Sequence, residues 1–148
     1  MKYTFEVEGR VKPKQSTKFA KIGNFVRTYT PSDVKSYSNW VRLCFKGAYP
    51  DFKPLEDAVK LLIEVNFIIP KSYSKKKVQM IEEGYTCPTV KPDCDNICKQ
   101  IADSLNGLAW LDDKQIVNLE VRKRFAKRDY VTISFEEWRE DLWIGWML

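Results

Sequence analysis

The stretch between residues 61 and 68 constrains the fold of this 148-residue chain more than any other part of the sequence. Four apolar residues alternate along it with other residues, namely Leu61, Ile63, Val65 and Phe67. This alternation predicts a β-strand, and Pro70 stops it. Leu62 and Ile68 make the opposite face partly apolar as well, which favours burial on both faces. The sequence therefore predicts a sheet built around this strand.

Shorter alternating patterns predict further strands on either side of the central one. They lie over residues 2–8, 24–29, 117–121 and 131–135. A basic loop is expected between the first two of them, from Arg10 to Lys21. The last two are expected to form a hairpin joined through the basic turn at residues 127–129.

Capping residues and helical spacing predict three helices, and apolar residues at helical spacing are expected to face inward, among them Val41 and Phe45 on the first helix and Ile97 and Ile101 on the third. The first begins with Thr30 as its N-cap and runs to Ala48, and the second runs from Ser74 to Gly84. The third has Asp95 as its N-cap and ends at residues 106–107. The mixed order of elements predicts an α+β domain, with one mixed sheet of about five strands packed against about three helices. We expect this domain to span residues 1–136, followed by a Trp-rich, acidic tail at 137–148 that is helical and packs on the domain or on a second subunit.

Composition excludes several classes of catalysis. The chain has no histidine, which rules out Ser-His-Asp and Cys-His mechanisms and His-ligated zinc. None of the four cysteines forms a C-x-x-C pair, so they are expected to be reduced thiols unless all four join in one zinc site. The net charge of +5 favours an anionic partner. No apolar stretch approaches the length of a membrane span, and no signal peptide is apparent, so we expect a cytoplasmic protein.

Carboxylates gather between residues 91 and 113. Asp93 and Asp95 are two residues apart, and on an extended backbone their side chains share one face. Lys99 follows one helical turn after Asp95, and Asp112-Asp113 precede a strand. If these segments meet, they form an open site of oxygen ligands, which suits Mg²⁺ and phosphodiester chemistry. In the alternative interpretation these residues have only structural roles. Asp93 and Asp95 then belong to an ordinary helix cap, and Lys99 forms an ion pair with Asp95 or Asp103.

The same segment resembles the RusA family of Holliday junction resolvases, which are small endonucleases often encoded by phages or prophages. The resemblance rests on Lys91-Pro92-Asp93-Cys94-Asp95-Asn96, then Lys99, Asp103 and Leu105-Asn106-Gly107, and finally Asp112-Asp113-x-Gln115-Ile116-Val117. Weaker similarity extends to the basic loop after Gly9 and to the run from Ile69 to Lys77, so that it covers about residues 1–136.

The resemblance implies Mg²⁺-dependent hydrolysis of branched DNA, in recombination and repair, by a homodimer. It implies catalytic roles for Asp93, Asp95, Lys99 and Asp113, and metal binding by Asp93, Asp95, Asp113 and Asp112. Phosphate contacts that read no sequence are expected from basic residues, namely Lys14, Lys18, Lys71, Lys75, Lys76, Lys77 and Lys91. The lysine run at 75–77 has an alternative interpretation as a solvated helix face.

Two other functions remain open on the sequence. One is a less selective nuclease that cuts forks or flaps with the same chemistry. The other is a DNA-binding module of the same fold that has lost catalysis, against which the intact set of Asp93, Asp95, Lys99 and Asp113 argues. The N-terminal loop departs from the family pattern at Ser16-Thr17-Lys18, which bears on DNA affinity and junction preference rather than on hydrolysis.

Overall fold

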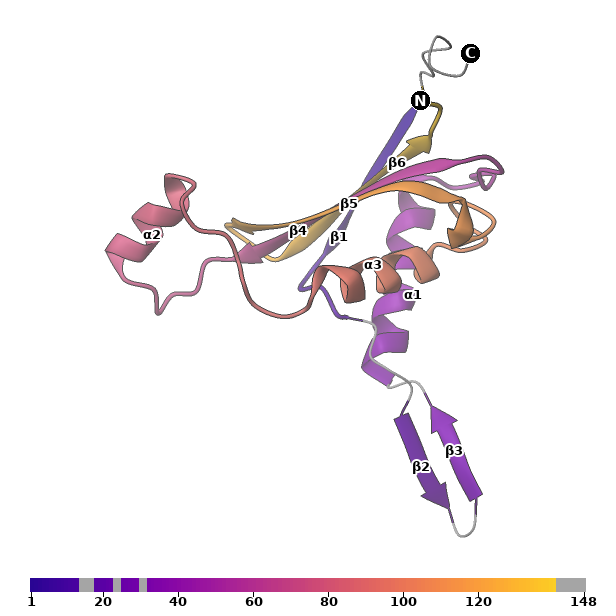
Figure 1. Ribbon diagram of the computed structural model, residues 1–148, viewed down its shortest axis with the longest axis horizontal. Helices are drawn as coiled ribbons and strands as arrows, with labels where there is room; N and C mark the ends of the chain where they lie inside the picture. Colours follow the sequence, from indigo (N-terminus) through magenta and orange to yellow (C-terminus); the bar gives the residue numbers. More distant parts are fainter. Residues whose placement is uncertain (14–17, 23–24, 30–31, 141–148) are drawn as a thin grey trace, which may run out of the picture.

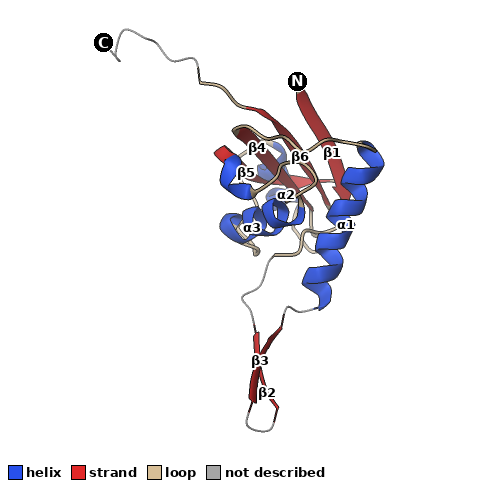
Figure 2. Cartoon of the chain, turned by 90° about the vertical axis from the view of Figure 1, so that its right-hand side faces the viewer, coloured by secondary structure: helices blue, strands red, loops and turns tan. Residues whose placement is uncertain are grey.

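A computed structural model describes residues 1–13, 18–22, 25–29 and 32–140, with side chains described for 1–13 and 36–140. It confirms the α+β prediction, since a mixed sheet carries helices on one of its faces (Figure 1, Figure 2). The elements are β1 (Lys2–Glu8), β2 (Lys18–Ile22), β3 (Phe25–Tyr29), α1 (Ser32–Ala48), β4 (Val59–Ile68), α2 (Lys75–Glu82), α3 (Cys94–Ser104), the 3₁₀ helix η1 (Asp113–Gln115), β5 (Ile116–Ala126) and β6 (Tyr130–Glu137).

The main sheet has four strands in the order β1-β6-β4-β5. Strand β4 pairs antiparallel with β6 on one side and parallel with β5 on the other, so it occupies the interior position that the sequence predicts. Its residues Leu61, Ile63 and Val65 have no exposed surface. The doubly apolar pattern of this strand was therefore a reliable guide to its place.

The predicted hairpin of the last two strands is wrong, because β4 lies between β5 and β6. The connection from Ala126 to Tyr130 passes over the end of β4, where the backbone N–H of Ile68 donates to a carboxylate oxygen of Asp129 at 2.9 Å. Two strand spacings amount to about 10 Å, which four residue steps of up to about 3.8 Å can span. A link this short can therefore join two adjacent strands in a hairpin or two strands that are separated by a third.

The N-terminal basic loop contains a strand that the sequence did not predict. Strand β2 pairs antiparallel with β3 in a separate two-stranded ribbon, with Ile22 opposite Phe25. Strand β3 confirms the prediction over 24–29, but it belongs to this ribbon rather than to the main sheet, which has four strands where about five were expected. The predicted N-cap Thr30 lies outside the described residues.

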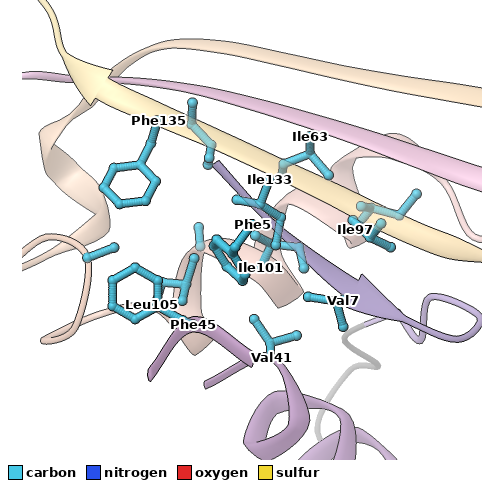
Figure 3. Close-up of a cluster of buried hydrophobic side chains, with 14 of the residues drawn as sticks. Phe5, Val7, Val41, Phe45, Ile63, Ile97, Ile101, Leu105, Ile133 and Phe135 are labelled. Carbon is cyan, nitrogen blue, oxygen red and sulfur yellow. The ribbon is translucent and has the colours of Figure 1, made fainter. Parts of the chain in front are cut away.

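The core fills the space between one face of the sheet and helices α1 and α3 (Figure 3). Helix α1 contributes Val41 and Phe45, and α3 contributes Ile97 and Ile101, all of them buried. They pack against apolar side chains from all four strands of the main sheet, among them Phe5, Val7, Ile63, Ile133 and Phe135. The helical faces predicted from the spacing of apolar residues are thus the buried ones.

The described part of the C-terminal segment continues the sheet instead of starting a helix. Glu136 and Glu137 belong to β6, and the backbone N–H of Trp138 donates to the carbonyl of Ala58 at 2.8 Å. The ammonium of Lys60 lies 4.9 Å from the Trp138 ring. The prediction for the remainder of the tail falls on residues 141–148, outside the described residues. Among the described helices, none combines the length and apolar character that crossing a membrane requires.

We predict that Ile63→Ala destabilises the protein far more than Ile68→Ala. Ile63 is fully buried in β4, whereas Ile68, at the end of the same strand, is 41% exposed. The first change should lower the free energy of unfolding by about 2–5 kcal/mol, because it removes apolar contacts and leaves a cavity. The second should cost less than about 1 kcal/mol. Urea unfolding of both variants checks this, and equal losses would contradict the central position of β4.

Candidate active site

The first carboxylates stand at the start of α3. Asp93 occupies the N-cap position with extended backbone angles (φ −67°, ψ 151°), and its side chain makes no capping hydrogen bond. Asp95 lies in the first turn of the helix. The prediction of Asp95 as the N-cap is therefore wrong by two residues, and the argument from an extended backbone does not apply to this pair. The Asp93 carboxylate is exposed and unengaged in capping, so it is available to a ligand.

A groove runs between α3 and β5, and we call it the α3/β5 groove. Asp95, Lys99 and Val121 line one part of it, and Lys99, Asp113 and Val117 line the adjoining part. Cys98, Lys99 and Leu119 line both parts. The groove therefore presents two predicted catalytic carboxylates along one surface, with the predicted catalytic lysine between them.

Helix geometry sets the spacing of the charges along α3. Asp95, Lys99 and Asp103 follow one another at intervals of four residues, which places them along one side of the helix. With a rise of 1.5 Å per residue, Asp95 and Asp103 are about 12 Å apart along the axis. Lys99 is thus about one turn from each of these two carboxylates.

The second set of carboxylates lies at the other end of α3. Asp113, the first residue of η1, contacts the carboxyl groups of Asp103 and Asp112 through side-chain hydrogen bonds. Burial raises the pKa of Asp113, and these hydrogen bonds together with repulsion from Asp112 and Asp103 raise it further. The turn after α3 therefore brings Asp113 beside Asp103, at the end of the helix and not at its start.

The thiol of Cys98 reports the same crowding of negative charge. Burial is the main cause that raises its pKa, and the carboxylates of Asp113, Asp103 and Asp95 add to it. Lys99 acts in the opposite direction. Carboxylates from both ends of α3 therefore raise the pKa of a thiol at the middle of the groove, and the positive charge of Lys99 partly offsets their effect.

Gln115 holds the second carboxylate set in place. Its amide oxygen accepts from the backbone N–H of Asp112 at 2.8 Å, and its amide nitrogen donates to the carbonyls of Leu55 and Asp57 at 2.8 and 3.0 Å. Sequence reasoning assigned no role to this residue. The signal was present, because an Asp followed three residues later by Gln is a capping-box pattern.

Helix α1 fixes the end of α3. The guanidinium of Arg42 donates to the carbonyl of Ser104 at 2.8 Å, and the hydroxyls of Ser38 and Ser104 are 2.9 Å apart. A cation at a helix C-terminus also interacts favourably with the helix dipole. Asp103 therefore sits on a helix end that a second helix restrains.

The residues present fit a hard divalent cation by their chemistry, although they are not gathered tightly. Within the described residues, no three His, Cys, Asp or Glu side chains converge closely enough to hold a metal ion. Mg²⁺ keeps several waters and commonly needs only one or two protein carboxylates. The donors are oxygen atoms, and the mutual repulsion around Asp113 is what a bound cation would relieve. The donor set therefore suits Mg²⁺ better than a soft metal.

The predicted DNA-binding lysines fall into three places. Lys71 and the run Lys75–Lys77 belong to α2 and its approach, and they are exposed, as is Lys91 just before α3. Helix α2 begins at the predicted cap, since the Ser74 hydroxyl accepts from the backbone N–H of Lys77 at 3.2 Å. Lys14 lies outside the described residues. Lys18 is in β2, where only the backbone is described.

Comparison with known proteins gives the chain its family. Residues 8–136 match the family described as Endodeoxyribonuclease RusA, and this match includes β4, β5, all but the last residue of β6, α3 and the whole α3/β5 groove. The chain is also 34% identical over 109 residues to a Bacillus subtilis (strain 168) protein named "Uncharacterized protein YqaN", covering 72% of this chain and 76% of that one. The chain belongs to the RusA endodeoxyribonuclease family, so its class is that of a DNA endonuclease.

Proposed function

We propose that this protein resolves Holliday junctions by Mg²⁺-dependent hydrolysis of phosphodiester bonds, in DNA recombination and repair. The observation that carries the proposal is the α3/β5 groove, where Asp95, Lys99 and Asp113 line one continuous surface in a chain of the RusA family. The exposed lysines of α2 and Lys91 supply positive charge for the DNA backbone.

Each residue of the site has a role in this proposal. Asp93 and Asp95 at the start of α3, and Asp113 with Asp112 near its end, would hold one or two Mg²⁺ ions, which when bound supply Lewis-acid activation of water and neutralise charge on the phosphate. The ammonium of Lys99 stabilises the negative charge that develops on the phosphate oxygens, or protonates the leaving 3′-oxygen. Asp103 and Gln115 keep Asp113 facing the groove.

A homodimer is part of the proposal, because a four-way junction has near two-fold symmetry and two sites would face opposing strands. Strand β5 is an edge strand of the main sheet, so its outer backbone edge is available for pairing with a second copy. A mass measured by light scattering that stays at one chain, with and without junction DNA, would rule the dimer out.

We expect Asp95→Asn and Asp113→Asn each to lower the rate of junction nicking in Mg²⁺ by orders of magnitude, because each loses a charged metal ligand. Asp57→Asn, an exposed carboxylate outside the groove, is the matched control and should cut normally. A synthetic four-way junction, a fork, a flap and a linear duplex, all with the same end label, measure rate and selectivity together.

The outcomes of this experiment separate the candidate functions. If forks or flaps are cut as fast as four-way junctions, the protein is a less selective branched-DNA nuclease and not a resolvase. If the wild-type protein binds four-way junctions tightly but cuts none of them in Mg²⁺, the protein is a DNA-binding module that has lost catalysis. Near-normal nicking by either aspartate variant would remove that residue from the site.

We expect Lys99→Ala to slow single-turnover nicking by about 10²–10³-fold at saturating Mg²⁺, as the loss of one donor to a developing oxyanion does. Lys99→Arg should also be impaired, because a planar guanidinium does not reproduce a compact ammonium. Lys46→Ala, at the exposed end of α1, serves as the control. A loss below about fivefold in Lys99→Ala would mean that Lys99 is only a helix ion-pair partner, whose removal costs a few tenths of a kcal/mol in stability.

We expect the triple change of Lys75, Lys76 and Lys77 to Ala to reduce the salt dependence of junction binding. Each phosphate contact contributes about 0.9 to the slope of log affinity against log salt. The matched control replaces three exposed lysines elsewhere, namely Lys2, Lys46 and Lys53. Titrations at several salt concentrations give both slopes, and an unchanged slope in the α2 variant would show that this lysine run is a solvated helix face.

A further inference from the structure

The segment from residue 70 to residue 91 forms an arm that leaves the end of β4 and returns at the start of α3. Helix α2, in the middle of the arm, buries none of its residues. Figure 1 shows it standing away from the sheet and from the other helices. An element with so little burial cannot hold its own position against the body of the protein, so its attachment points decide where it lies.

Both attachment points of the arm rest on β5. On the outgoing side, the rings of Tyr73 and Phe125 meet edge to face, with centroids 6.2 Å apart. On the returning side, the ammonium of Lys123 donates a hydrogen bond to the carbonyl of Val90. Lys123 and Phe125 are two residues apart, so they project from the same face of the strand.

That face of β5 is also the wall of the α3/β5 groove. Leu119 and Val121 line the groove, and Lys123 follows them at the next position on the same face. With a rise of about 3.3 Å per residue, Lys123 lies about 7 Å beyond Val121 along the strand. One row of side chains therefore contacts first the groove and then the two attachment points of the arm.

Lys123 is used differently from the cations next to it in the sequence. Arg122 and Arg124 project from the opposite face and pair with Glu120 and Glu64 at 2.8 and 2.9 Å. Lys123 is a half-buried residue whose ammonium lies 6.0 Å from the ring centroid of the buried Phe67, and among the described residues it has no ion-pair partner. Its polar contact is a main-chain carbonyl three residues before Asp93.

We propose that Lys123 is a positioning residue for the site. By holding the carbonyl of Val90 against β5, it fixes the start of α3, so that Asp93 and Asp95 keep their place along the groove relative to Asp113. It also ties the lysine-bearing arm to the same strand, which links the position of bound DNA to the position of the carboxylates. This inference rests on the proposed function, since it concerns the same site.

The test replaces the donor and keeps the length of the side chain. Lys123→Met removes the ammonium, Lys123→Arg restores a donor to the same carbonyl, and Arg124→Met removes a neighbouring cation from the opposite face as the matched control. Two readouts are taken for each: amide hydrogen exchange of the segment 88–97, and single-turnover nicking of a four-way junction together with its dissociation constant.

We expect Lys123→Met to exchange faster over residues 88–97 and to nick at least about 10-fold more slowly, with the dissociation constant within about twofold of wild type. A displacement near 1 Å in a reacting group can cost on the order of 10²-fold in rate, which allows a loss of this size. Lys123→Arg should restore both readouts, and Arg124→Met should change neither. The inference is overturned if exchange in Lys123→Met is unchanged, or if its rate loss is matched by a loss of binding, which would make Lys123 a phosphate contact.

The exchange measurement keeps this inference separable from the proposed function. If the wild-type protein fails to cut any branched DNA, the proposed function fails, and the coupling of the arm to catalysis fails with it. Exchange then still decides whether Lys123 holds the start of α3. If Lys123→Met does not fold, shown by a lost unfolding transition, Phe125→Leu tests the other attachment point: faster exchange over residues 70–76 with slower nicking supports the coupling, and unchanged nicking overturns it.

Discussion

The parallel pairing of β4 with β5 is the constraint on which the rest of the site depends. Two parallel neighbours cannot be joined by a tight turn, so the chain must cross from one end of the pair to the other. Every predicted catalytic residue lies in this crossover, between Ile68 and Ile116. The crossover carries the arm, α3, the turn around Trp110 and η1, in that order, and so it places the predicted DNA-binding lysines of the arm and the predicted catalytic groups in one connection.

The direction of α3 follows from the same constraint and sets the layout of charge. The groove residues show that α3 runs opposite to β5, because Asp95 shares its part of the groove with Val121, whereas Asp113 shares its part with Ile116. The two carboxylate sets therefore begin and end one helix of 11 residues, about 16 Å long. Lys99 lies near the middle, where a single cation can act on charge that develops between the sets.

Sequence patterns predicted the features that depend on the burial of apolar side chains. They missed the features that depend on which strand or backbone group a residue pairs with. The two apolar faces of β4 revealed its interior position, and the spacing of Ile97 and Ile101 revealed the buried face of α3. The alternation in β5 and β6 indicates that each is a strand, but it does not indicate which strand pairs with which. A hairpin was therefore predicted, whereas β4 lies between the two strands. Asp93 and Asp95 are equally good N-caps by residue type, which left an ambiguity of two positions.

Three of the side chains that secure the crossover by polar contacts share one chemical character, and this suits a site rich in carboxylates. Gln115 donates to Leu55 and Asp57, Arg42 donates to Ser104, and Lys123 donates to Val90, in each case to a main-chain carbonyl. A carbonyl has no net charge, so these donors do not draw on the carboxylates of the site. If Arg42 or Lys123 instead formed an ion pair with Asp95 or Asp113, that acid would be neutralised by the protein itself and would bind a divalent cation less well. Backbone-directed donors therefore fix the geometry of the crossover and leave the negative charge of the α3/β5 groove available for the proposed metal ion.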